Sequence, residues 1–141
     1  ARHWRRSGFD DLRVAVNVST VQLLEVDLVD QLETRLAAAD VAFDQFEIEL
    51  SESTLLRDVE RIRTALRRLR SYGVGLTLDD FGMGGAGLVQ LPRYPLSKIK
   101  IDRDFTGEIA HDHGQPAIAR AIIAMGRQLH LKVMPEGVAP E

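Results

Sequence analysis

The sequence contains no cysteine, no excess of basic residues and no long apolar run. The lack of cysteine excludes disulfides and thiolate metal sites and is compatible with a reducing cytoplasm. A net charge of −3 argues against a nucleic-acid polymer as partner. No apolar run approaches the roughly 18 residues of a membrane span, and no signal peptide opens the chain. We therefore expect a cytoplasmic domain, whose parent protein can still be anchored to a membrane through other domains.

What the sequence does contain is a regular alternation of strand and helix patterns. Apolar residues alternate with polar ones in five segments, residues 12–19, 46–51, 74–80, 97–102 and 131–137. Leucines and other apolar residues recur at helical spacing within 20–39, 55–69 and 118–129, and Gly73 follows the second of these as a left-handed cap. This order predicts an α/β fold with parallel strands, either an open doubly wound sheet or a barrel.

The polar positions of the strands favour the barrel. A doubly wound sheet is covered on both faces, so its central strands are apolar on both. Here each strand has one apolar and one polar side. One polar residue per strand lies near its C-terminal end, where barrel enzymes build their sites: Asn17, Glu49, Asp79, Lys100 and Glu136. We predict a (β/α)8 TIM-like barrel, of which this chain supplies about five consecutive βα units.

These strand ends carry more acid than base. Asp80 follows Asp79 directly, so four carboxylates would share the barrel mouth with one lysine. Unpaired buried ions cost several kcal/mol each, and divalent cations are the counter-charge that such a cluster needs. Oxygen ligands suit Mg²⁺ or Mn²⁺ rather than zinc. Carboxylates beside a lysine fit two-metal hydrolysis of a phosphodiester.

The segment after Asp80 also contains a possible dinucleotide-binding motif. Gly82, Gly84 and Gly87 spell G-x-G-x-x-G. A dinucleotide fold needs a crossover helix to begin there, and Pro92 and Pro95 interrupt the few residues before the next strand. The adjacent aspartates would also repel a pyrophosphate. We conclude that the glycines form a loop and that the carboxylates carry the chemistry.

Five stretches in this order resemble the EAL domain of bacterial cyclic di-GMP phosphodiesterases: VNVS, EIELSES, LDDFGMG, KIKIDRDF and PEGV. The resemblance covers residues 1–141 and implies a TIM-like barrel. It also implies a partial domain, because the upstream E-A-L tripeptide with its arginine and the C-terminal end of the domain are absent. The implied reaction is attack of metal-activated water on one phosphodiester of cyclic di-GMP, which gives linear pGpG.

The resemblance also implies a role for individual residues. Asn17, Glu49 and Asp79 would bind the first metal ion, and Asp79 would bridge to a second ion held by Asp80 and Glu136. Lys100 would orient the attacking water, which makes Lys100, Asp80 and Glu136 the candidate catalytic residues. Two further residues would support the site: Glu52, which steadies the loop after the aspartates, and Asp102.

The chain departs from the family pattern in that loop. The family's T-G-Y-S-S is Met83-Gly84-Gly85-Ala86-Gly87 here, and the second glutamate of A-E-G-V-E is Ala139. The loop has lost its hydroxyls, which leaves Glu52 without an obvious side-chain donor. Glycine also adds backbone freedom that ordering must overcome. We predict a mobile loop and weakened metal binding.

Two functions remain open at this stage. The retained ligands and lysine favour a phosphodiesterase, whereas the altered loop favours a degenerate domain that acts as a cyclic di-GMP receptor or an interaction module. The expected partners are cyclic di-GMP, a second copy of the chain in a homodimer, and a tethered GGDEF or sensory domain.

Overall fold

The computed structural model describes residues 13–82, 90–102 and 115–135. They form one parallel sheet with helices and short 3-10 turns between its strands. The strands are β1 (Val14–Asn17), β2 (Phe46–Ser51), β3 (Gly75–Phe81), β4 (Lys98–Ile101) and β5 (Lys132–Pro135). The helical elements are α2 (Thr20–Leu23), α3 (Leu28–Ala39), η1 (Phe43–Gln45), α4 (Glu52–Leu55), α5 (Val59–Ser71), η2 (Leu91–Arg93) and α7 (Gln115–Gln128).

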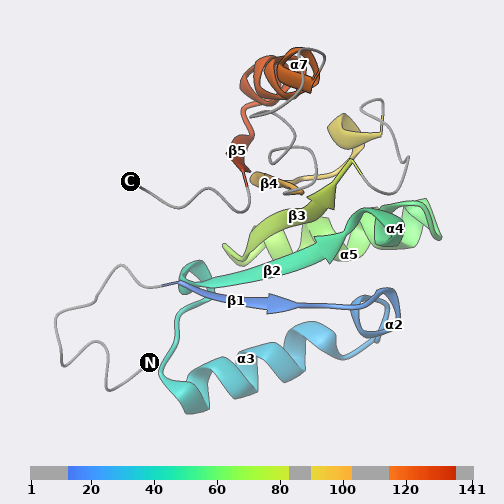
Figure 1. Cartoon of the computed structure of the whole chain (residues 1–141). Helices are drawn as coiled ribbons and strands as arrows, with labels where there is room; N and C mark the ends of the chain where they lie inside the picture. The colour runs from blue at the N-terminus through green and yellow to red at the C-terminus, as the bar shows by residue number, and fades with distance from the viewer. Residues whose placement is uncertain (1–12, 83–89, 103–114, 136–141) are drawn as a thin grey trace, which may run out of the picture.

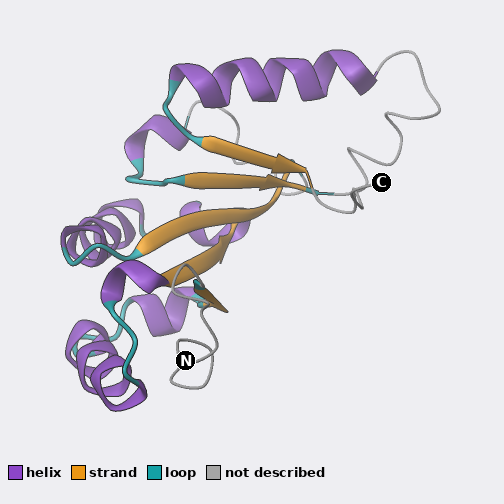
Figure 2. Cartoon of the chain, turned by 90° about the vertical axis from the view of Figure 1, so that its left-hand side faces the viewer, coloured by secondary structure: helices purple, strands orange, loops and turns teal. Residues whose placement is uncertain are grey.

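The sheet has the strand order β1-β2-β3-β4-β5, and every neighbouring pair is parallel. The order therefore follows the chain without the reversal that marks a doubly wound sheet. Figures 1 and 2 show α3, α5 and α7 on the same side of the curved sheet, and none of these three helices covers its other face. This is the arrangement of consecutive βα units in a TIM-like barrel, so the prediction of fold class is confirmed.

The core lies between the sheet and its helices. Ile48, Leu76 and Ile99 are fully buried on the three central strands, and Ile62 and Leu66 are fully buried on α5. These positions belong to the apolar side of each strand pattern. The edge strand β1 is less well covered, since Val16 on its apolar side is exposed. The apolar side therefore packs on the helices, and the polar side faces the barrel interior.

The predicted cap of the second helix is confirmed. Gly73 has φ +94°, a conformation that glycine adopts without a steric cost. The Val74 N–H donates to the Leu69 carbonyl, and the Gly73 N–H donates to the Arg70 carbonyl. These bonds close the helix as a Schellman motif and lead the chain directly into β3.

Two predicted helices are each split in the structure. Residues 20–39 were predicted as one helix and form α2 and α3, while the apolar stripe over 55–69 is divided between α4 and α5. Leu23 and Val29 explain the first break, because both are buried. One continuous helix would point two residues six positions apart about 120° away from each other. The turn between α2 and α3 lets both side chains enter the core.

No helix in the described ranges is long and apolar enough to cross a membrane.

Candidate active site

The strand register brings four of the five predicted strand-end residues to one edge of the sheet. Asn17 on β1 lies level with Glu49 on β2, and Ser51 on β2 lies level with Asp79 on β3. Lys100 stands near the end of β4. The fifth residue, Glu136, lies outside the described residues. The candidate site therefore draws its side chains from four consecutive strands, as a site at the mouth of a barrel does.

An ion-pair cluster occupies the centre of this edge. The Lys100 Nζ lies 2.6 Å from the Glu49 Oε1 and 4.0 Å from the Asp79 Oδ1. The three side chains are largely buried, with 22%, 11% and 19% of their surfaces exposed. The ammonium thus lies close to one carboxylate from β2 and within 4.0 Å of one from β3. Two acids that converge on one positive charge form a pocket of negative potential that suits a cation.

Asp80 follows Asp79 at an irregularity of β3. Consecutive strand residues normally point to opposite faces, so Asp79 and Asp80 could not both face the interior of a regular strand. The register between β3 and β4 shifts between Leu78 and Phe81, and Asp80 has φ +53°. Such bulges re-aim side chains next to active sites. The sequence pattern contains no signal for this bulge.

The pKa of Asp80 is raised above its ordinary value. Partial burial is the largest cause, followed by the negative charges of Asp79 and Asp102, while Lys100 opposes the shift. Asp102, predicted as a supporting residue, is therefore close enough to act on Asp80 electrostatically. Repulsion among these acids favours binding of a cation beside them.

Glu52 supports the turn after the aspartates by a contact that the sequence analysis did not anticipate. The residue is 3% exposed, and its Oε2 accepts a hydrogen bond of 3.1 Å from the Gly82 backbone N–H. A backbone amide, rather than a side-chain donor, supplies the bond. The predicted supporting role of Glu52 therefore does not depend on the lost hydroxyls of residues 83–87. Those residues, with the predicted mobility of their loop, lie outside the described residues.

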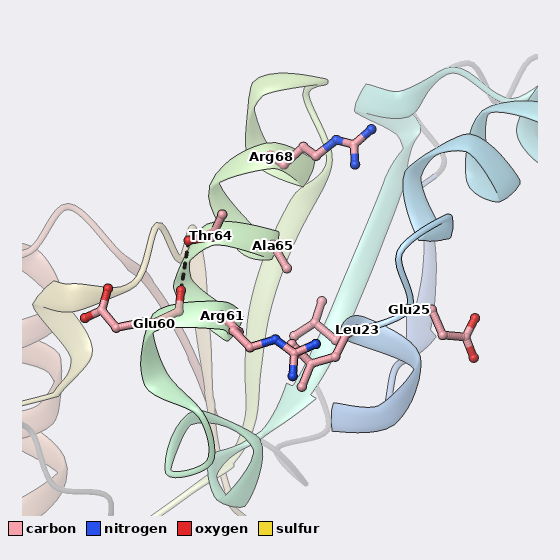
Figure 3. Close-up of a pocket in the computed structure, with 8 residues that line it drawn as sticks. Leu23, Glu25, Glu60, Arg61, Thr64, Ala65 and Arg68 are labelled. Atoms are coloured by element: carbon pink, nitrogen blue, oxygen red, sulfur yellow. Dashed lines mark hydrogen bonds between the residues drawn. The ribbon is translucent and has the colours of Figure 1, made fainter.

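Two of the candidate metal ligands line a hollow between β1, α2 and α4. Asn17 and Glu49 line it together with Ser51, Ser53 and Arg57, and its volume is about 560 Å³. The hollow places hydroxyls and a guanidinium beside two of the candidate metal ligands. A second hollow of about 350 Å³ lies between α2 and α5 and contains none of the candidate site residues (Figure 3).

A second ion pair lies one layer below the site and was missed by the sequence analysis. The Lys98 Nζ donates to both carboxylate oxygens of Glu47, at 2.7 and 2.8 Å, and the Thr77 hydroxyl donates to Glu47 Oε1 at 2.6 Å. Glu47 and Thr77 are buried. The strand alternation contained the signal, since Glu47 and Lys98 each precede a site residue of the same polar side by two positions.

The donor chemistry fits a hard divalent cation. Asn17, Glu49, Asp79 and Asp80 offer only oxygen atoms, the ligands that Mg²⁺ and Mn²⁺ prefer. Within residues 13–82, 90–102 and 115–135, no group of three or more Asp, Glu, His or Cys side chains is arranged to hold a metal ion. In this arrangement the Lys100 ammonium is instead the cation bound by Glu49.

Comparison with known proteins gives one family for the whole chain. The family model of the EAL domain matches residues 1–141. The bifunctional diguanylate cyclase/cyclic di-GMP phosphodiesterase MucR of Pseudomonas aeruginosa is 41% identical over 99% of this chain and 20% of its own length. The cyclic di-GMP phosphodiesterase NbdA of the same organism is 42% identical over 94% of the chain and 17% of its own length. The chain thus spans about one fifth of the length of these relatives.

Solved structures agree with this family. The MucR phosphodiesterase in complex with c-di-GMP is 41% identical and superimposes with a TM-score of 0.88, covering 99% of this chain and 57% of that one. A manganese/cy-diGMP complex of BlrP1 from Klebsiella pneumoniae is 30% identical, with a TM-score of 0.88 over 96% of this chain and 35% of that one.

Proposed function

This chain belongs to the EAL domain family, and we propose that the protein carrying it hydrolyses one phosphodiester bond of cyclic di-GMP to give linear pGpG. The relatives named as cyclic di-GMP phosphodiesterases support this substrate. The observation that carries the proposal is the convergence of Glu49, Asp79 and Lys100 from three consecutive strands. We also propose that residues 1–141 are part of a longer EAL domain, because the chain spans 57% of the MucR phosphodiesterase structure.

We propose that two divalent cations, Mg²⁺ or Mn²⁺, bind at this edge. Asn17, Glu49 and Asp79 would hold the first, and Asp79, Asp80 and Glu136 the second. The oxygen donors support the assignment, as does the manganese complex of the Klebsiella relative. When bound, such ions make water a stronger nucleophile and offset the charge of the phosphate. For Glu49 to act as a ligand, its carboxylate has to be released by the Lys100 ammonium, which lies 2.6 Å away.

The remaining roles follow from charge and position. Lys100, once released from Glu49, can donate to the attacking water or to a phosphate oxygen and so orient the two reactants. In the reaction, water adds to one phosphorus, the ester bond to a ribose oxygen breaks, and that oxygen takes up a proton. Glu52 keeps the turn after Asp80 in place through Gly82. Asp102 would support Asp80 electrostatically.

A receptor that binds cyclic di-GMP without cleaving it is the second candidate. The loss of every hydroxyl in residues 83–87 favours this function, because it removes side-chain donors next to the candidate ligands. For either function we propose a homodimer and a tethered GGDEF or sensory domain, in keeping with the greater length of the relatives. We expect the domain to work in the cytoplasm, since the chain lacks cysteine.

The experiment is Mg²⁺-dependent cleavage of cyclic di-GMP by the full-length protein, with pGpG measured by chromatography. Glu49→Ala should lower the rate by more than about 100-fold, because it removes a ligand of the activating ion. Glu60→Ala is the matched control, since the Glu60 side chain is 74% exposed on α5 and should leave the rate unchanged. Binding of cyclic di-GMP without any cleavage by the wild-type protein would favour the receptor instead.

A further inference from the structure

The interior face of the sheet carries two lysine–glutamate pairs, one above the other. The upper pair is Lys100 with Glu49, and the lower pair is Lys98 with Glu47. Both pairs join β4 to β2 across the intervening strand β3. The lower pair is the more enclosed, because the Glu47 side chain is 5% exposed and Lys98 contacts both of its carboxylate oxygens.

The strand register shows that Lys98 does not pair with the glutamate level with it. Lys98 lies level with Thr77 on β3, and Thr77 lies level with Glu49 on β2. Strands lie about 4.8 Å apart, so the backbones of Lys98 and Glu49 are roughly 10 Å apart, which two long side chains can span. Glu47 is two residues farther back along β2. Lys98 therefore pairs with a glutamate below its own level, although Glu49 stands directly across the sheet.

The surroundings of Glu47 explain why the pair forms there. The buried Thr77 hydroxyl holds Glu47 Oε1 on the side of β3. Gly75 lies level with Glu47, and a β-carbon at Gly75 would come within 3.3 Å of the Glu47 Cγ. A small residue on β3 at that level leaves room for the glutamate to reach toward Lys98.

We propose that Glu47 is a positioning residue that retains Lys98 in the lower layer and so keeps its ammonium away from Glu49. This inference rests on the proposed function, since Glu49 is there a ligand of a divalent cation. With Glu47 present, the Lys98 ammonium contacts a carboxylate of opposite charge. Without it, the largely buried Lys98 ammonium would lose the acid that it contacts, and Glu49, which lies level with Lys98 two strands away, would be available as its partner. A second lysine on Glu49 would compete directly with the cation.

The test is Mn²⁺ binding to the full-length protein without nucleotide, measured by titration calorimetry, in Glu47→Gln, Lys98→Gln and the double variant. Glu47→Gln is nearly isosteric and should weaken Mn²⁺ binding by about tenfold or more, because Lys98 turns to Glu49. Lys98→Gln alone should bind Mn²⁺ like the wild type. The double variant should recover to within about threefold of the wild type, since the competing charge is gone.

If Glu47→Gln weakened Mn²⁺ binding by disturbing packing rather than by releasing Lys98, the three variants would give different affinities from those above. If the double variant binds Mn²⁺ as weakly as Glu47→Gln, or if Glu47→Gln binds normally, Glu47 does not act by restraining Lys98 and the proposal is wrong. Thr77→Val removes only the hydroxyl bonded to Glu47 and is a milder variant, which should weaken binding severalfold. Circular dichroism establishes that each variant is folded.

A crystal structure of Glu47→Gln without metal separates this inference from the proposed function. Lys98 should then form an ion pair with Glu49. A Lys98 side chain that stays in the lower layer would overturn the positioning role, whatever the wild-type protein does with Mn²⁺. Conversely, a wild-type protein that binds no divalent cation would contradict the proposed metal site. The crystal structure of Glu47→Gln would still show whether Lys98 moves to Glu49.

Discussion

Lys100 is the residue on which the charge balance of the site depends. Its ammonium lies 2.6 Å from a carboxylate oxygen of Glu49, and both side chains are largely buried. Replacement by methionine would leave the largely buried Glu49 carboxylate without its close counter-charge, which destabilises the folded protein. In EDTA we expect Lys100→Met to lower the free energy of unfolding by about 1–3 kcal/mol.

Divalent cations should reverse that loss in the full-length protein, because they provide the missing positive charge between Glu49 and Asp79. Denaturant unfolding with and without Mn²⁺ measures both effects. Lys132→Met is the control, since Lys132 is exposed on β5 and its replacement should change stability little in either condition. An equal loss of stability with and without Mn²⁺ would mean that the cation does not bind beside Glu49.

Glu47 should make stability depend on acid pH. Burial by itself raises the pKa of Glu47, but the hydrogen bonds from Lys98 and Thr77 and the charge of Lys98 outweigh it, so the pKa is lowered. A carboxylate whose folded pKa is depressed stabilises the fold above its unfolded pKa, near 4.5. That contribution is lost as the pH falls through the folded pKa.

The measurement is the difference in unfolding free energy between the wild type and Glu47→Gln, followed from pH 7 down to pH 3. The wild type should be the more stable at neutral pH, and the difference should shrink once the pH falls below about 4.5. A difference that is constant over this range would show that ionised Glu47 contributes nothing specific to the fold.

At the scale of elements, the contact of α7 with β5 depends on a glycine. A β-carbon at Gly126 would overlap the Cγ2 methyl group of Val133. Alanine is the better helix former by about 0.5–1 kcal/mol, but overlap with a stiff β-branched side chain costs about 1–3 kcal/mol. Gly126→Ala should therefore lower stability despite its higher helix propensity.

A double-mutant cycle with Val133→Ala tests the cause. In the Val133→Ala background the overlapping methyl group is absent, so Gly126→Ala should be neutral or stabilising there. Thermal unfolding of the four proteins gives the coupling. If Gly126→Ala is equally destabilising in both backgrounds, the contact with Val133 is not the reason for the glycine.

Sequence patterns predicted the elements better than their interruptions. The alternation in residues 46–51 and 97–102 and the glycine after α5 were sufficient to predict β2, β4 and the helix cap, because these signals are local. The break between α2 and α3 was not predictable in the same way. It depends on Leu23 and Val29 having to be buried together, a requirement of the tertiary structure rather than of the local sequence.

In the candidate site, too, local side-chain patterns were predictive and backbone irregularities were not. The polar side of each strand predicted that Glu49, Asp79 and Lys100 would meet, because parallel strands in register bring equivalent positions together. The register shift at Asp80 and the amide of Gly82 that binds Glu52 are backbone features without a side-chain signal. The lower pair of Glu47 and Lys98 follows the same alternation, but its residues lie two positions before the strand ends, where the pattern alone does not separate a buried ion pair from a solvated one.

At the scale of the whole molecule, these features form a layered barrel interior. The apolar side of the sheet packs on α3, α5 and α7 (Figure 1), and the opposite face carries the Lys98–Glu47 pair below the Lys100–Glu49 pair, which has Asp79 beside it. The hydrophobic layer fixes the strands, and the strands fix the spacing of the acids at their ends. The function proposed for the EAL domain therefore depends on strand register rather than on a single motif.

The central claim is that acids from neighbouring strands bind divalent cations at this edge, and Mn²⁺ anomalous diffraction from crystals of the full-length protein tests it most directly. We predict an anomalous peak with oxygens of Glu49 and Asp79 at about 2.0–2.6 Å, and a Lys100 ammonium that has left Glu49. A Mn²⁺-soaked crystal without a peak at these carboxylates, in which Lys100 still holds Glu49, would contradict the account.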